Sequence, residues 1–102
     1  MTTEAGTAAT DEAAGRGLVA LMWEAKAAPG RGAELLAWAR SRPLPGPDRR
    51  ETFGAGADRV LVISWWRTAE GLRAELPELP DPPAELVSRP VHRWRFESLG
   101  VG

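Results

Sequence analysis

The sequence contains no cysteine, asparagine, glutamine or tyrosine, and it has one histidine and one lysine. The lack of cysteine excludes a disulfide scaffold, a thiolate zinc site and a cysteine nucleophile. No apolar run approaches the roughly 20 residues that a membrane-spanning helix needs. The chain has thirteen basic and fourteen acidic residues. This balance is not typical of proteins whose main partner is nucleic acid. We expect a cytoplasmic protein that binds neither nucleic acid nor membrane, and that holds no metal or other cofactor.

The residues that are present fit one small globular domain, because 43% of the 102 are hydrophobic. Five of them are tryptophans, each with a large apolar surface and one N–H that needs a partner. So many tryptophans in so short a chain indicate a ligand pocket, a subunit interface, or both.

The chain divides near residue 16. Residues 1–15 are mainly Thr, Ala, Gly and acidic residues, and they cannot bury enough apolar surface to offset the entropy of ordering. We predict a disordered tail over 1–15. Because it lacks a basic start and an apolar stretch, it is not a secretory signal. Residues 16–102 are predicted to form the folded domain.

The hydrophobic pattern predicts four strands, over residues 17–28, 49–54, 59–67 and 91–99. Helices are predicted over 32–42, which Pro43 ends, and from Thr68, a good N-cap, to about 76. A further helical turn is predicted within 83–89. This β-α-β-β-α-β order predicts an α+β, ferredoxin-like protomer with a four-stranded antiparallel sheet.

Strands 17–28 and 59–67 are apolar on both faces, although two helices cover only one face of such a sheet. Glu24 and Lys26 mark the point where the first strand should emerge into solvent. A bare apolar face of this size favours aggregation in a monomer. We therefore predict a homodimer in which two sheets pack face to face.

Three segments carry a resemblance to a known family. They are Trp66-Arg-Thr-Ala-Glu-Gly-Leu72, Lys26-Ala-Ala-Pro-Gly30 and Ala84-Glu-Leu-Val-Ser-Arg-Pro90. Together they resemble the antibiotic biosynthesis monooxygenase family of the dimeric α+β barrel superfamily. The resemblance implies a dimeric barrel in which each protomer keeps a pocket between its sheet and its helices. It matches Trp66 to the Trp of the family's pocket, whereas the family's Asn and Tyr have no counterpart here.

Two residues are the candidate catalytic groups. Trp66 would form a flat wall for an aromatic substrate, and His92 would act as a general base on a phenol. The candidate substrate-binding residues are Trp66, Ser64, Trp94, Phe96 and Trp38. For each of them the alternative is an ordinary core, interface or surface residue.

Strand alternation adds an expectation about faces. His92, Trp94 and Phe96 share one face of the last strand, which we take as the helix-covered face. Arg93 and Arg95 then face the partner sheet, where they would pair with Glu97 or Glu24. Trp65 points away from Trp66 and is expected to lie in the dimer core.

These features predict a small cofactor-independent enzyme of secondary metabolism. It would be an oxidoreductase, similar to the monooxygenases, acting on an aromatic or polyketide-type substrate in a Trp-lined pocket between sheet and helices. A polyketide cyclase or isomerase, a haem-binding or haem-degrading relative, and a non-catalytic dimer that binds a small molecule remain as alternatives.

Overall fold

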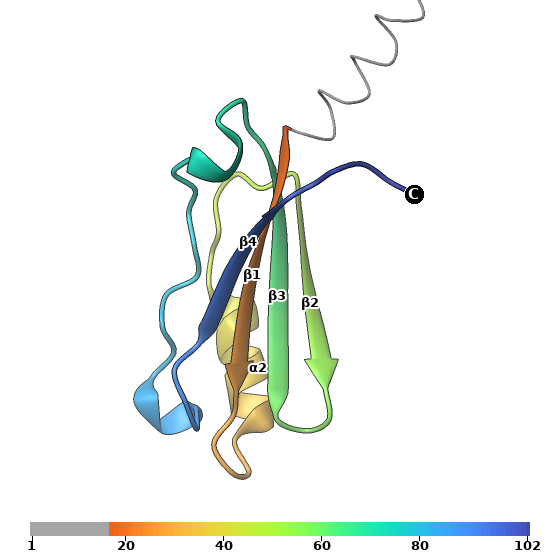
Figure 1. Ribbon diagram of the computed structural model, residues 1–102. Coiled ribbons are helices and arrows are strands. Elements are labelled where there is room, and N and C mark those ends of the chain that lie inside the picture. Colours follow the sequence, from red (N-terminus) through yellow and green to blue (C-terminus); the bar gives the residue numbers. More distant parts are fainter. Residues whose placement is uncertain (1–16) are drawn as a thin grey trace, which may run out of the picture.

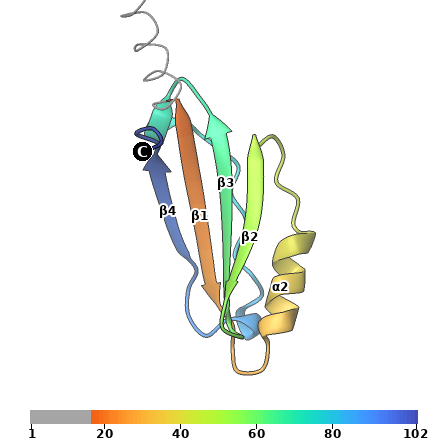
Figure 2. The same cartoon turned by 90° about the vertical axis from the view of Figure 1, so that its right-hand side faces the viewer.

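The computed structural model describes residues 17–102, so the tail predicted over 1–15 lies outside the described residues. Four strands form one antiparallel sheet in the order β2-β3-β1-β4 (Figure 1). They are β1 (Leu18–Lys26), β2 (Arg49–Ala55), β3 (Arg59–Arg67) and β4 (His92–Glu97). One helix, α2 (Gly32–Ser41), lies against one side of this sheet (Figure 2). The protein is therefore of the α+β class, and its sheet is compatible with a ferredoxin-like fold.

Alternation along β1 and β3 sets the two faces of the sheet. Val19 and Trp23 of β1, like Val62 and Trp66 of β3, are at most 5% exposed on the side that α2 covers. We call this side the covered face. The other side is the open face, and no helix or loop among residues 17–102 lies across it. Its apolar residues are Leu18, Ala20, Met22, Phe53, Leu61, Ile63, Trp65, Trp94 and Phe96.

Helix α2 is present where the sequence predicted it. Glu34 in its first turn receives two hydrogen bonds from Arg31, at 2.6 and 2.9 Å, and Leu35 and Ala39 are fully buried against the sheet. At Gly32 the helix meets the β2–β3 hairpin, where an added Cβ would lie 1.9 Å from the carbonyl oxygen of Ala57. Only glycine permits this approach.

The prediction of a second α-helix over 68–76 is wrong. The segment holds a single 3₁₀ turn, η1 (Gly71–Arg73), after which Ala74 is extended. The Thr68 hydroxyl accepts a hydrogen bond from the Glu70 N–H at 3.2 Å in the turn before η1, but Glu70, and not Thr68, is the N-cap residue of η1. Gly71 then has φ +59°, a left-handed value that interrupts a right-handed helix.

An extended segment replaces the missing helix as the cover of β1 and β4. We call residues 74–83 the proline strap, since Pro77, Pro80, Pro82 and Pro83 keep it out of regular structure. A second 3₁₀ turn, η2 (Ala84–Leu86), follows where a helical turn was predicted. The buried Leu79 of the strap and Leu86 of η2 complete the core around Leu35.

Candidate functional site

The predicted pocket residues Ser64 and Trp66 lie together on the covered face. Both are at most 5% exposed, and the Trp66 indole Nε1–H donates to Ser64 Oγ at 2.9 Å. Leu44 and Leu76 pack near the Trp66 ring, and an added Cβ at Gly46 would contact it at 3.6 Å. Trp66 is therefore a core residue in this chain, with its one polar atom satisfied.

The space beside Ser64 is too small for an aromatic ligand. A cavity there measures about 10 Å³ and is lined by Leu21, Trp23, Leu79 and Arg93 among others. One water molecule needs about this volume, whereas small-molecule sites measure about 300–1,000 Å³. The interior next to Trp66 is filled by the protein's own side chains.

Trp38 belongs to a different part of the molecule from Trp66. Its ring stacks on Trp23 with centroids 6.1 Å apart, and the Arg42 guanidinium lies 5.4 Å from the Trp38 ring centroid. Trp38 packs against the larger core cluster around Leu35, whereas Trp66 belongs to the smaller one. The structure therefore does not bring these two predicted ligand contacts together.

The expectation that His92, Trp94 and Phe96 lie on the helix-covered face is wrong. In the register of β4 with β1, Phe96 is opposite Ala20 and Trp94 is opposite Met22, which places all three residues on the open face. Trp94 and Phe96 are 45% and 54% exposed. They lie on the opposite side of the sheet from Ser64 and Trp66.

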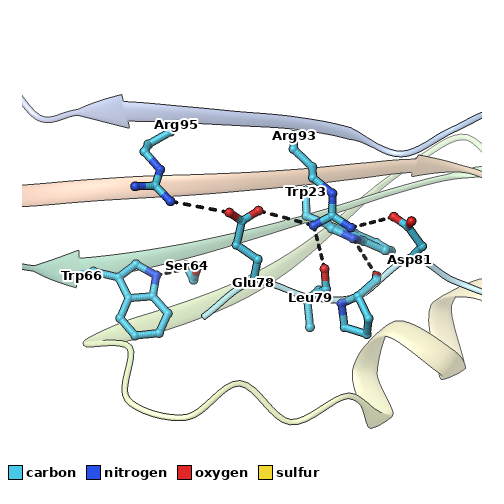
Figure 3. A network of polar contacts seen from close by, with 9 residues as sticks. Trp23, Ser64, Trp66, Glu78, Leu79, Asp81, Arg93 and Arg95 are labelled. Carbon is cyan, nitrogen blue, oxygen red and sulfur yellow. Dashed lines mark hydrogen bonds and ion pairs between the residues drawn. The ribbon is translucent and has the colours of Figure 1, made fainter. Parts of the chain in front are cut away.

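Arg93 and Arg95 occupy the covered face instead, which corrects their predicted pairing across a dimer (Figure 3). Arg93 donates to the Leu79 carbonyl at 2.6 Å and to Asp81 Oδ1 at 2.7 Å. Arg95 donates to the Ala74 carbonyl at 2.6 Å, and Glu78 lies within 3.5 Å of both guanidinium groups. The strap offers carbonyl acceptors to these arginines, so the polar side of β4 turns inward.

A polar cluster on the open face was not predicted. Glu24 is 5% exposed, although the sequence indicated that β1 emerges there. Its carboxylate accepts hydrogen bonds from Arg59 Nε at 2.9 Å and from Arg89 at 2.6 Å, and His92 Nδ1 lies 3.5 Å from Oε1. We call these four residues the Glu24 cluster. Arg89 is far from Glu24 in the sequence, so spacing carried no signal for their contact.

The electrostatics of the cluster favour an ionised Glu24. Burial alone would raise the pKa of this carboxyl group. The hydrogen bonds from Arg89 and then Arg59 outweigh burial, and the pKa of Glu24 is lowered from its ordinary value of 4.5. Glu24 is thus a fixed negative charge beside the imidazole of His92, which in turn contacts the Trp94 ring edge-on at 5.4 Å between centroids.

Searches of the described residues 17–102 for two other kinds of site were negative. They contain no group of three or more His, Asp or Glu side chains placed to hold a metal ion. No helix among them is long and apolar enough to cross a membrane.

Comparisons of the chain with protein-family models, with curated proteins and with solved structures returned no match.

Proposed function

We propose that this protein is a homodimer that acts on a small aromatic molecule without a bound cofactor, with His92 as the proton-transferring group. The observation that carries this proposal is the Glu24 cluster together with Trp94, because they combine a buried carboxylate, a histidine and an aromatic side chain at one end of the open face. This site is distinct from the pocket predicted beside Trp66, where the cavity next to Ser64 holds only about 10 Å³.

The arrangement around His92 suits a general base. A carboxylate 3.5 Å from Nδ1 favours the tautomer that carries its proton on Nδ1, which leaves Nε2 free to accept a proton from a phenol. The His92 side chain is 51% exposed, so a substrate reaches it directly. Positioned proton transfer of this kind contributes about 10²–10⁴-fold to a rate.

The resemblance to the antibiotic biosynthesis monooxygenase family supports the reaction class. A phenolate is electron-rich enough to pass electrons to dioxygen without a cofactor. With dioxygen as the oxidant, a ring CH₂ becomes C=O and one water molecule leaves, so atoms and electrons balance. A cyclase or isomerase would use the same proton transfer without oxygen.

The open face supports the homodimer. Ile63 and Trp65 of β3 lie beside Met22 and Ala20 of β1, and no described segment buries them. Apolar patches of this kind mark interfaces between subunits. Pairing two open faces would bury these side chains and leave the Glu24 cluster at the edge of the interface.

Sedimentation velocity tests the homodimer with two variants. We expect the wild type to sediment as a dimer at micromolar concentration and Ile63→Asp to sediment as a folded monomer. Ala33→Asp changes an exposed position on α2 and should remain dimeric. A folded wild-type monomer at that concentration would overturn the homodimer.

Turnover of anthrone in air-saturated buffer tests the chemistry. The wild type should speed quinone formation, and His92→Gln should remove most of the acceleration. Arg40→Gln, an exposed change on α2, is the matched control. Equal rates for the wild type and His92→Gln would refute the role of His92.

A second candidate function is a non-catalytic dimer. The filled interior beside Ser64 favours it, because a binding pocket between the sheet and its cover would need more than the measured 10 Å³. In that case neither the wild type nor His92→Gln would change the rate of anthrone oxidation, although the dimer would persist.

A further inference from the structure

A surface groove lies next to the Glu24 cluster. It runs along the end of the proline strap, η2 and the residues that lead into β4, which form the lower left of Figure 1. Its volume is about 560 Å³, within the range of small-molecule sites. The lining residues are Asp81, Pro82, Ala84, Val87, Ser88, Arg89, Pro90 and Val91.

The walls of this groove suit a flat apolar body. Pro82, Pro90, Val87 and Val91 supply rigid or branched apolar surface. Val87 and Val91 also pack against the main core, so this wall is held in place. Such a surface fits the face of an aromatic ring without ordering flexible side chains.

Arg89 joins the groove to the Glu24 cluster. One of its terminal nitrogens donates to Glu24 Oε1 at 2.6 Å and the other to the Pro90 carbonyl at 3.2 Å. Arg59 holds the other oxygen of Glu24 through Nε at 2.9 Å. Its side chain is 54% exposed, and its terminal N–H groups point to no acceptor among the described residues.

The charge around the groove is unbalanced toward positive. Arg89 and Arg59 both bind the carboxylate of Glu24, and Lys26 is opposite Arg59 in the strand register, on the same face of the sheet. Asp81 does not restore the balance, because Arg93 already binds its Oδ1 at 2.7 Å. Glu85 of η2 lies near Arg31, which already pairs with Glu34, so three cations are set against two carboxylates. A ligand that carries a negative charge is therefore favoured here.

We propose that this groove binds an aromatic carboxylate, with its ring against Pro82, Val87 and Pro90 and its charge toward Arg89. Arg59 does not line the groove, but it adds a second positive charge nearby, on the other oxygen of Glu24. This inference deepens the proposed function, because it names the substrate class and places the substrate beside His92. The inference rests on the proposed function only for the reaction, because the groove and the positive charge around it do not depend on any reaction.

The test is an NMR titration with two ligands of one shape. The acid is 2-naphthoate and its uncharged match is 2-naphthylmethanol. We expect the acid to shift the backbone amides of Val87, Ser88 and Val91 and to bind at least about tenfold more tightly, the difference that one charge-assisted hydrogen bond provides. Since the chain has one histidine, its imidazole signals report contact with His92 without ambiguity.

Three variants separate charge, shape and folding. Arg89→Gln should abolish the preference for the acid, and Arg40→Gln should keep it. Ala84→Trp fills the groove at an exposed position and should weaken both ligands. Because Arg89→Gln also removes a partner of Glu24, its amide spectrum must match the wild type outside the groove. If the spectrum differs, Arg59→Gln, which removes the other partner of Glu24, is held to the same spectral check and should lower the preference for the acid.

The outcomes distinguish this inference from the proposed function. Equal binding of the two ligands at the groove amides would overturn the preference for an anion. Groove shifts with the acid, combined with anthrone turnover that does not depend on His92, would support the groove and overturn the proposed reaction. Absence of any groove shift would overturn the inference, while turnover that depends on His92 would still support the function.

Discussion

Both faces of the sheet carry apolar side chains, but the charged residues on the two faces have different kinds of hydrogen-bond partner. On the covered face, Arg93 and Arg95 are matched to backbone carbonyls of the strap. On the open face, Glu24 is matched to two arginine side chains and lies near His92. The hydrogen-bond partners that lie nearby therefore decide which face of the sheet a charged residue occupies, more than alternation along the strand does.

The largest effect on stability is expected from a substitution in the apolar packing of the covered face. Leu35 is fully buried between α2 and the sheet, so Leu35→Ala should lower the free energy of unfolding by about 3 kcal/mol. Urea unfolding followed by circular dichroism measures this loss. Leu36→Ala, at a half-buried neighbour, is the control, and an equal loss there would show that α2 does not pack as described.

The next effect tests the polar part of the same interior. Ser64→Ala removes the acceptor of the buried Trp66 indole N–H and should cost about 2 kcal/mol, because that donor is left unsatisfied. Ser88→Ala, at an exposed serine, should change stability little. A neutral Ser64→Ala would mean that water reaches the indole nitrogen.

A smaller effect is expected where the strap meets β4. Arg93→Ala removes hydrogen bonds to Leu79 and Asp81 and should cost about 1.5 kcal/mol, since Arg93 is one-third exposed and its bonds are charge-assisted. Hydrogen exchange at the Trp23 indole N–H, which donates to the Pro80 carbonyl of the strap at 3.3 Å, should accelerate more than exchange within α2. Uniform acceleration would show that strap and helix unfold together.

The smallest effect concerns pH and the open face. The pKa of Glu24 is lowered on folding, so its contribution to stability is present above its ordinary pKa of 4.5 and is lost as the pH falls through the folded value. We expect less than about 1 kcal/mol, because Arg59 is more than half exposed.

Unfolding in urea at about pH 7 and about pH 3.5 measures this effect by bracketing the ordinary carboxyl pKa. Glu24→Gln should lose the part of the pH dependence that Glu24 supplies, and Glu75→Gln, at an exposed position of the strap, is the matched control. An unchanged pH dependence in Glu24→Gln would break the link between Glu24 and the stability of the open face.

The sequence predicted those elements whose signals are local. Strand β3, an apolar run, begins and ends at the predicted residues. Helix α2 ends one residue earlier than predicted, before Pro43. The helix predicted from Thr68 failed because Gly71 takes a left-handed conformation, which the capping pattern does not reveal.

The candidate site depends on contacts between distant parts of the chain, and it was only partly predictable. Two-residue spacing correctly placed His92, Trp94 and Phe96 on one face of the sheet, and Trp65 on the face opposite to Trp66. The face of β4 was assigned wrongly because the carbonyls of the strap, which attract Arg93 and Arg95, have no signature in the sequence. Glu24 was missed as a buried residue because Arg89 approaches it from 65 residues away.

The contact between Gly32 and the carbonyl of Ala57 has a mechanical consequence. With no side chain between them, the first turn of α2 and the loop that joins β2 to β3 pack backbone against backbone. Any side chain at position 32 would wedge the hairpin away from the helix, so the seating of α2 on the sheet depends on this one glycine.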